Sequence, residues 1–157
     1  MDHNMFCFQC EQTAGCTGCT SRGVCGKDAQ TAQVQDRLTG ALIGLARAAD
    51  TSPDAGPETW QLMIEGLFAT LTNVNFDPDS LNALAGRVRA EKQRLVPDCA
   101  VCTAPCGRTG DYDLAQLWGA QEDIRSLKSL LLFGSRGMAA YAYHAMVLGY
   151  RDESVER

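Results

Sequence analysis

The sequence of 157 residues predicts an all-α protein in which a cysteine-rich loop precedes two small helical bundles. Apolar residues recur every three or four positions along most of the chain, which is the period of a helix with one buried face. No run of alternating β-branched residues indicates a strand. The loop is marked by five cysteines within the first 25 residues, where few side chains are apolar.

Residues 1–27 form the predicted loop, and they contain too few apolar side chains to fold around a core of their own. Several thiolates that bind one metal centre would supply the missing order. Glycines permit the tight turns and close backbone approaches that such a centre needs. They are Gly15, Gly18, Gly23 and Gly26.

Residues 28–95 predict the first helical bundle, built from three helices with short connections. Asp28 is expected to cap the first helix, and Pro57 is expected in the first turn of the second. The third helix is expected to begin at Asp79 or Ser80. The apolar stripes of the three helices are Val34, Leu38, Ala41, Leu42, Leu45 and Ala49; Trp60, Met63, Ile64, Leu67, Phe68 and Leu71; and Leu81, Leu84, Ala85 and Val88.

Residues 96–112 predict a second irregular loop that also carries cysteines. The second helical segment, residues 113–157, follows it and opens with a short helix over Leu114–Trp118. The last residues have the pattern of a further helix start, with Asp152 as its cap. We therefore expect this segment to continue in a longer parent protein.

A long helix is expected from about Glu122 to Leu148, with Gly149 as its C-cap. Its most apolar stretch, residues 130–148, includes Arg136 and His144, so it predicts a buried helix and no membrane span. The apolar stripe of this helix is Ile124, Leu127, Leu130, Leu131, Met138, Tyr141, Ala145 and Leu148.

The composition narrows the classes of partner and compartment. A net charge of −5 and a pI near 4.9 argue against nucleic acid or an anionic membrane as partner, and they permit a basic redox partner. Eight cysteines without an N-terminal signal sequence predict a reducing, cytoplasmic location and metal binding. An extracellular disulfide framework is the alternative, which the tight C-x2-C pairs disfavour.

The first five cysteines admit two sets of four metal ligands. One set is Cys7, Cys10, Cys16 and Cys19, a C-x2-C-x5-C-x2-C pattern. The other replaces Cys16 with Cys25 and gives C-x2-C-x8-C-x5-C. Zinc and iron–sulfur centres both accept four thiolates. Zinc knuckles are often supported by β-hairpins, which this chain lacks, whereas unequal glycine-rich spacing suits a larger cubane cluster.

Five segments carry a family resemblance. Near the N-terminus, M-F-C-F-Q-C-E-Q-T-A (residues 5–14) is followed by G-C-T-S-R-G-V-C-G-K (18–27) and L-T-G-A-L-I-G-L-A (38–46). G-L-F-A-T-L-T-N-V-N-F spans 66–76, and the long helix runs from E-D-I-R-S-L-K to Y-H-A-M-V-L-G-Y (122–150). In this order they are similar to the start of the hybrid cluster proteins, also called prismane proteins or hydroxylamine reductases.

The resemblance implies an N-terminal all-α domain of two three-helix bundles and a cubane-type cluster near the N-terminus. The family's cluster ligands match Cys7, Cys10, Cys19 and Cys25. Their eight-and-five spacing resembles members that carry a 4Fe–4S cluster, whereas members with longer spacing carry 2Fe–2S. Cys16 then lies outside the ligand set.

The same resemblance implies that this chain carries no catalytic residues. Family enzymes are several times longer and bind their hybrid cluster through histidine, glutamate and cysteine residues of later domains. His3 and His144 are the only histidines here, and His144 is expected to pack in a core or an interface. We therefore expect an electron-transfer module that passes single electrons toward a catalytic centre in another domain or a redox partner protein.

Three alternatives stay open from the sequence. The chain can be a fragment of a full hydroxylamine or nitric oxide reductase, a cluster-based redox sensor, or a zinc-stabilised interaction domain. A second metal site is a further hypothesis, with Cys99, Cys102 and Cys106 as ligands and Cys16 as a possible fourth. It would hold zinc or another iron–sulfur cluster, and the alternative is three free thiols.

Three side chains beside the cysteines have two interpretations each. Phe6 and Phe8 can shield a cluster and tune its potential, or they can serve packing alone, which is the commoner role. Lys27 can balance the charge of a cluster or contact a partner, but the default expectation is a solvated lysine.

Overall fold

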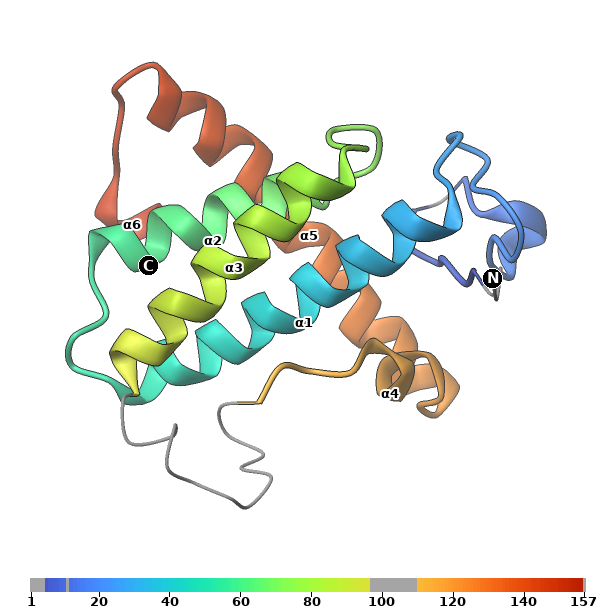
Figure 1. Ribbon diagram of the computed structural model, residues 1–157, viewed down its shortest axis with the longest axis horizontal. Coiled ribbons are helices and arrows are strands. Elements are labelled where there is room, and N and C mark those ends of the chain that lie inside the picture. Colours follow the sequence, from blue (N-terminus) through green and yellow to red (C-terminus); the bar gives the residue numbers. More distant parts are fainter. Residues whose placement is uncertain (1–4, 11, 97–109, 157) are drawn as a thin grey trace.

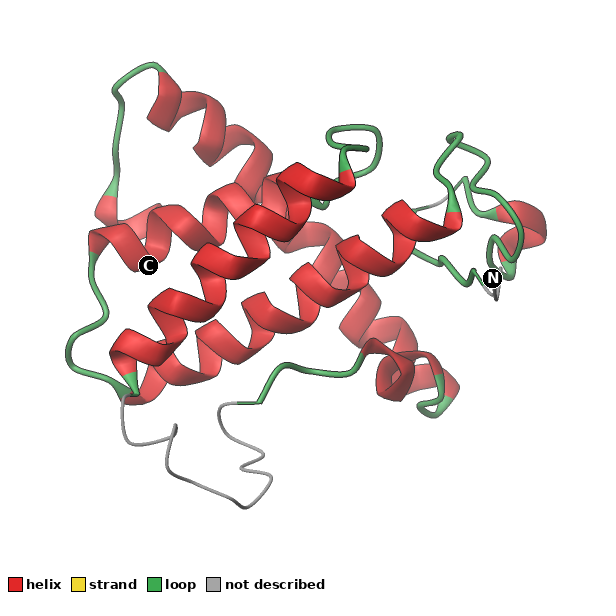
Figure 2. Cartoon of the chain, viewed as in Figure 1, coloured by secondary structure: helices red, strands yellow, loops and turns green. Residues whose placement is uncertain are grey.

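The computed structural model describes residues 5–10, 12–96 and 110–156, and within these ranges all regular elements are helices (Figures 1 and 2). The all-α prediction is therefore confirmed, while the division into two bundles and the domain boundaries stay predictions. The elements are η1 (Ala14–Cys16), α1 (Ala29–Thr51), α2 (Pro57–Ala69), α3 (Pro78–Leu95), α4 (Leu114–Trp118), α5 (Glu122–Val147) and α6 (Glu153–Glu156).

Side-chain caps determine where the first and third α-helices begin. Asp28 caps α1 as predicted, because its carboxylate accepts a hydrogen bond of 2.7 Å from the Thr31 N–H. Helix α3 begins at Pro78, slightly earlier than predicted. Asp77 is its cap and accepts from the Asp79 N–H at 3.0 Å, and proline suits the first helical position because it has no N–H to satisfy.

Helices α1, α2 and α3 share one hydrophobic core. Helix α3 lies along α1, and α2 contacts both of them, while α5 runs behind α2 (Figure 1). Each fully buried leucine in such a core contributes roughly 1.5–3 kcal/mol to the free energy of unfolding. The buried members are Val34, Leu38, Ala41, Leu42, Leu45, Ala48, Ala49, Leu62, Ala69, Leu81, Leu84, Ala85, Val88 and Leu95.

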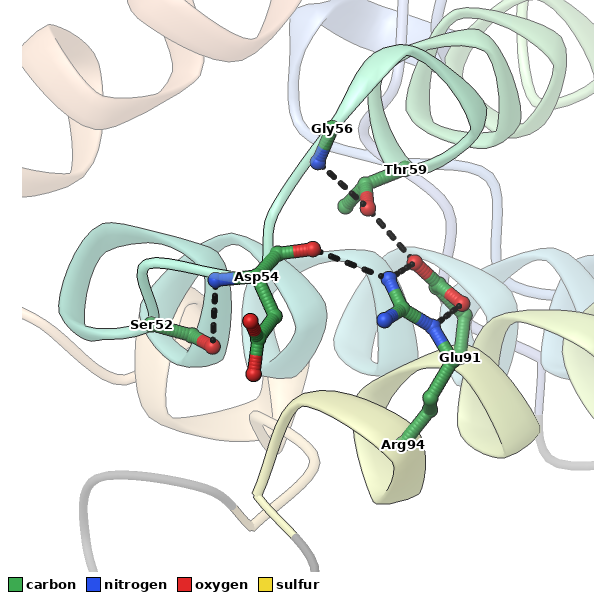
Figure 3. Close-up of polar contacts among 6 residues, drawn as sticks. All are labelled: Ser52, Asp54, Gly56, Thr59, Glu91 and Arg94. Carbon is green, nitrogen blue, oxygen red and sulfur yellow. Dashed lines mark hydrogen bonds and ion pairs between the residues drawn. The ribbon is translucent and has the colours of Figure 1, made fainter.

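Polar contacts fasten the loop between α1 and α2 to α3 (Figure 3). Glu91 of α3 accepts a hydrogen bond from Thr59 at 2.5 Å and forms an ion pair with Arg94 at 2.7 Å. Arg94 also donates to the main-chain oxygen of Asp54 at 3.2 Å, and Thr59 accepts from the Gly56 N–H. The loop is therefore held to α3 by both main-chain and side-chain groups.

A close backbone contact brings the segment before α4 onto α1. The Tyr112 N–H donates to the Gly40 oxygen at 2.9 Å, and a Cβ on Gly40 would lie only 2.2 Å from the Tyr112 oxygen. Asp111 adds ion pairs to Arg89 and Lys92 of α3, at 2.8 and 2.5 Å. Glycine at position 40 therefore allows this segment to lie flat on α1 and places α4 beside the N-terminal loop.

Helix α5 departs from the prediction of a buried helix. Its predicted apolar stripe is mostly exposed, with Leu127 63%, Leu131 71% and Tyr141 84% accessible. The face that α5 packs against α2 carries polar residues, so the apolar pattern of the sequence did not indicate it. On this face, Phe68 of α2 stacks on Tyr143, with ring centroids 4.5 Å apart. Residues on that face are buried or half-buried and recur at helical spacing: Ser129, Leu132, Arg136, Ala139, Tyr143 and Met146.

The end of α5 confirms one local prediction and narrows another. Gly149 adopts φ 84° directly after the helix, and the Tyr150 N–H donates back to the Ala145 oxygen at 2.9 Å, which is a Schellman cap. His144 is exposed and meets the edge of Phe68 at 5.3 Å, so it lies outside the core, and its place in an interface stays a prediction. Within the described ranges, no helix has the length and apolar character to cross a membrane.

The Gly40 contact makes a stability prediction. Gly40→Ala should lower the free energy of unfolding by about 1–3 kcal/mol, because the new Cβ forces the Tyr112 backbone away from α1. Gly86→Ala in α3 is the matched control, because a Cβ there meets nothing within 4 Å and should stabilise by about 0.5–1 kcal/mol. Urea unfolding followed by circular dichroism measures both, and equal effects would contradict the close contact.

Candidate functional site

Two of the predicted ligands form the centre of the N-terminal loop. Cys7 and Cys19 pair as an isolated antiparallel bridge, with N–H···O distances of 2.9 and 2.8 Å. Both cysteines are buried, whereas Cys10 and Cys25 are half-buried. The bridge thus places Cys7 directly beside Cys19, 12 positions apart in the sequence.

Main-chain amides approach the sulfur of Cys19. The Ala14 N–H donates to Sγ at 3.4 Å, and the Thr13 hydroxyl lies 3.9 Å from it. Burial raises the pKa of Cys19, but hydrogen bonds from the Ala14 and Val24 amides outweigh it and leave that pKa below the usual thiol value. Such N–H···S contacts favour the thiolate, which is the form that binds metals.

Glycines leave room for the loop to close around its sulfurs. Gly18 has φ 139°, and a Cβ there would lie 2.4 Å from the Phe6 ring. A Cβ on Gly23 would lie 3.1 Å from Cys25 Sγ and 3.1 Å from Lys27 Cβ. A side chain at position 18 would collide with the Phe6 ring, and one at position 23 would fill the space next to Cys25 Sγ.

An aromatic cluster braces the outer side of the loop. Trp118 of α4 meets Phe6 and Phe8 edge to face, with ring centroids 5.7 and 5.9 Å apart. Because these phenylalanines flank Cys7 on an extended segment, the cysteine points to the opposite side. Packing is therefore the observed role of both phenylalanines. Trp118 was missed by the sequence analysis, since nothing in its local pattern links it to the loop.

Lys27 is buried, which corrects the expectation of a solvated lysine. Only 2% of the residue is exposed, and its Nζ lies 3.9 Å from Cys7 Sγ and donates to Gln35 Oε1. The physical reason is a turn in which Gly26 adopts φ 92° and the Gly23 N–H donates to the Lys27 oxygen at 2.8 Å. This turn directs the side chain inward, beneath Cys7.

A second buried cation and a carboxylate lie near Lys27. Arg136 of α5 is 2% exposed and donates to the hydroxyls of Thr70 and Thr39, each at 2.9 Å. Asp36 of α1 accepts from the side-chain amide of Gln9. Burial raises the pKa of Asp36 to about 6, although Lys27 and Arg136 act in the opposite direction. In the sequence, the only sign of Asp36 and Arg136 was that each is a charged residue within an apolar helix.

None of the predicted ligand sets is tested by the structure. Cys99, Cys102 and Cys106 lie outside the described residues, and so does the side chain of Cys16. Among the described side chains, no three His, Cys, Asp or Glu groups lie close enough together to hold a single metal ion.

The donor set nevertheless fits a thiolate-held metal centre. Soft sulfur ligands dominate the loop, amides donate to sulfur, and glycines keep the space beside the thiols free of side chains. The Gln9 Oε1 and Arg136 Nη1 atoms are buried without a hydrogen-bond partner, so polar groups beneath the loop keep unused bonding capacity.

Comparison with known proteins gives one consistent result. The model of the Prismane/CO dehydrogenase family matches residues 5–157. A hydroxylamine reductase of Desulfitobacterium hafniense is 40% identical over 172 residues, which cover 97% of this chain and 31% of the relative. Hydroxylamine reductases of Clostridium perfringens and Methanocella arvoryzae are 40% and 39% identical, and 32% of each is covered. The chain thus spans about a third of the length of these curated relatives.

The raised pKa of Asp36 makes a prediction about pH. The folded chain binds this proton more tightly than the unfolded chain, so the free energy of unfolding should fall as pH rises from about 4 to 6, by up to about 3 kcal/mol. Asp36→Asn should remove this fall and make the metal-free chain more stable at pH 7.

Asp111→Asn is the control for this experiment. Although burial raises the pKa of Asp111, hydrogen bonds from Lys92 and Arg89 leave it below its usual value. Its stabilisation is therefore present at neutral pH and lost in acid, so the variant should be less stable at pH 7. Urea unfolding at several pH values measures both, and an unchanged slope in Asp36→Asn would contradict the assignment.

Proposed function

Because the chain belongs to the Prismane/CO dehydrogenase family, we propose that its N-terminal loop holds an iron–sulfur cluster and that the chain is an electron-transfer module. The resemblance read from the sequence is confirmed by the family match and by the hydroxylamine reductases that share about 40% of its residues. The observation that carries the proposal is the Cys7–Cys19 bridge, which places two of the four proposed ligands side by side.

Cys7, Cys10, Cys19 and Cys25 are the proposed ligands of a 4Fe–4S cluster. All four side chains lie in the described part of the loop, two buried and two half-buried. When bound, such a cluster supplies reversible one-electron chemistry. Each thiolate binds one of the four irons, so no iron keeps an open position for substrate. The centre therefore suits electron transfer better than substrate binding.

The neighbouring residues have distinct roles in this proposal. The Ala14 amide favours the thiolate form of Cys19, and Gly23 keeps side chains away from Cys25 Sγ. Phe6 and Trp118 pack edge to face on the outer side of the Cys7 segment. Amide–sulfur hydrogen bonds shift the potential of a cluster, so the Ala14 amide helps to set how readily the site accepts an electron.

The destination of the electron is a centre outside these residues. The relatives are named hydroxylamine reductases, and this chain covers about a third of their length. We therefore propose a relay that delivers electrons to a catalytic centre in another domain or in a partner protein. A fragment of a complete reductase would use the loop in the same way.

Replacement of the ligands tests the cluster assignment. Cys7→Ser, Cys10→Ser, Cys19→Ser and Cys25→Ser should each lose most of the iron and acid-labile sulfide after anaerobic reconstitution, because a cubane needs all four thiolates. Cys16→Ser is the matched control and should keep the wild-type content. Metal analysis with electron paramagnetic resonance makes the measurement.

Two results would contradict this assignment. Equal losses in Cys16→Ser and the four ligand variants would show that the ligand set is wrong. Zinc at one equivalent, without iron or sulfide, would favour the zinc-stabilised interaction domain instead.

A relay should undergo redox change without turnover. We expect the reconstituted chain to accept and return one electron, but not to oxidise reduced viologen continuously when hydroxylamine or nitric oxide is added. The reason is that its proposed cluster has no open iron site. Sustained oxidation of the dye that depends on substrate, and that Cys7→Ser abolishes, would show a catalytic centre within residues 1–157.

A further inference from the structure

Two positive charges are buried beneath the cysteine loop, at positions far apart in the sequence. Lys27 and Arg136 are each 2% exposed, which is rare because a buried charge loses its hydration. Burial lowers the pKa of Arg136 to about 10, so it stays protonated at neutral pH. Both cations interact electrostatically with Cys7.

Neutral groups, and not carboxylates, hold these cations in place. Lys27 donates to the amide oxygen of Gln35, and Arg136 donates to the hydroxyls of Thr39 and Thr70. Each hydroxyl gives its own proton to a helix carbonyl, at 2.8 Å for Thr39 and 2.9 Å for Thr70. Among the described residues, no carboxylate oxygen lies within 4.0 Å of either cation.

The charges beneath the loop therefore do not balance. Asp36 is the carboxylate that interacts with both cations, and one carboxylate offsets only one of the two positive charges. Arg136 Nη1 is also buried without a hydrogen-bond partner. A buried cation that lacks an anion costs several kcal/mol of stability, so this region needs further negative charge.

We propose that Arg136, together with Lys27, supplies the positive charge that compensates the thiolate-bound cluster and raises its reduction potential. This inference rests on the proposed function. A cubane held by four thiolates is an anion, and reduction adds one more negative charge. A fixed cation nearby stabilises the reduced state more than the oxidised state, and burial weakens the screening by solvent. Helix α5 thereby contributes directly to the chemistry of the loop.

The decisive experiment measures the midpoint potential of the reconstituted chain by electron paramagnetic resonance at controlled potential. Arg136→Met should lower the ratio of reduced to oxidised cluster at least tenfold at a fixed potential, which corresponds to a shift of about 59 mV for one electron. Arg136→Lys should restore most of the wild-type potential. Arg87→Met is the surface control, because Arg87 is exposed and pairs with Glu65, and it should leave the potential unchanged.

A structural role for Arg136 makes different predictions. Thr70→Val removes one of its acceptors but keeps its charge, so the chain should lose stability while the potential stays at the wild-type value. In the metal-free chain, Arg136→Met should not lower the melting temperature, because it removes a buried charge without a close anion. A large loss of stability in that metal-free variant, together with a potential equal to that of wild type, would overturn the proposal.

The outcomes separate this inference from the proposed function. If wild type takes up no iron and sulfide, the proposed function fails. If wild type loads but Arg136→Met has the potential of wild type and of Arg87→Met, only the inference fails. Should Arg136→Met not fold, Arg136→Gln replaces it, because glutamine keeps donors for Thr39 and Thr70 without the charge. An unchanged potential in Arg136→Gln would then overturn the proposal.

Discussion

The main-chain pairing of Cys7 with Cys19 is the contact on which the N-terminal loop depends. Two hydrogen bonds, of 2.9 and 2.8 Å, hold together a segment that has almost no apolar core. Without this bridge the entropy of the glycine-rich chain would oppose any fixed arrangement of sulfurs. The bridge also aligns Phe6 and Phe8 toward α4 and leaves Cys7 above Lys27.

Three helices supply side chains that pack around this bridge. Helix α1 begins directly after the loop and supplies Gln35 and Asp36. Helix α4 supplies Trp118, and it reaches the loop only because Gly40 allows the preceding segment to lie against α1. Helix α5 supplies Arg136 through its polar face. The helical core thus positions a site that is built mostly outside it.

Helix positions followed from the sequence because their signals are local. The Asp28 cap, Pro57 in the first turn of α2 and Gly149 after α5 each act on backbone within a few residues. The exposure of α5 could not be predicted in the same way. Periodicity shows which residues share a face, but not which face a distant helix will cover.

The candidate site was also predictable only in part, because local patterns do not show which distant segments meet. The ligand set came from spacing and resemblance, and it stays a prediction. Lys27 and Arg136 were missed as a pair because burial of a charge depends on contacts between distant segments, while a single lysine or arginine is usually solvated. Trp118 was missed because its partners, Phe6 and Phe8, lie at the other end of the described chain.

The separation in sequence between Arg136 and the cysteine-rich loop has a consequence for biosynthesis. Arg136 follows Cys25 by 111 residues, so the cysteines leave the ribosome long before their buried counter-charge. At about 5–20 residues per second, this interval lasts roughly 5–20 s. During that time the thiols are part of a nascent chain without α5, and they are open to oxidation or to the wrong metal. Insertion of the proposed cluster is therefore best timed after translation of α5, when the loop and the cations beneath it are in place.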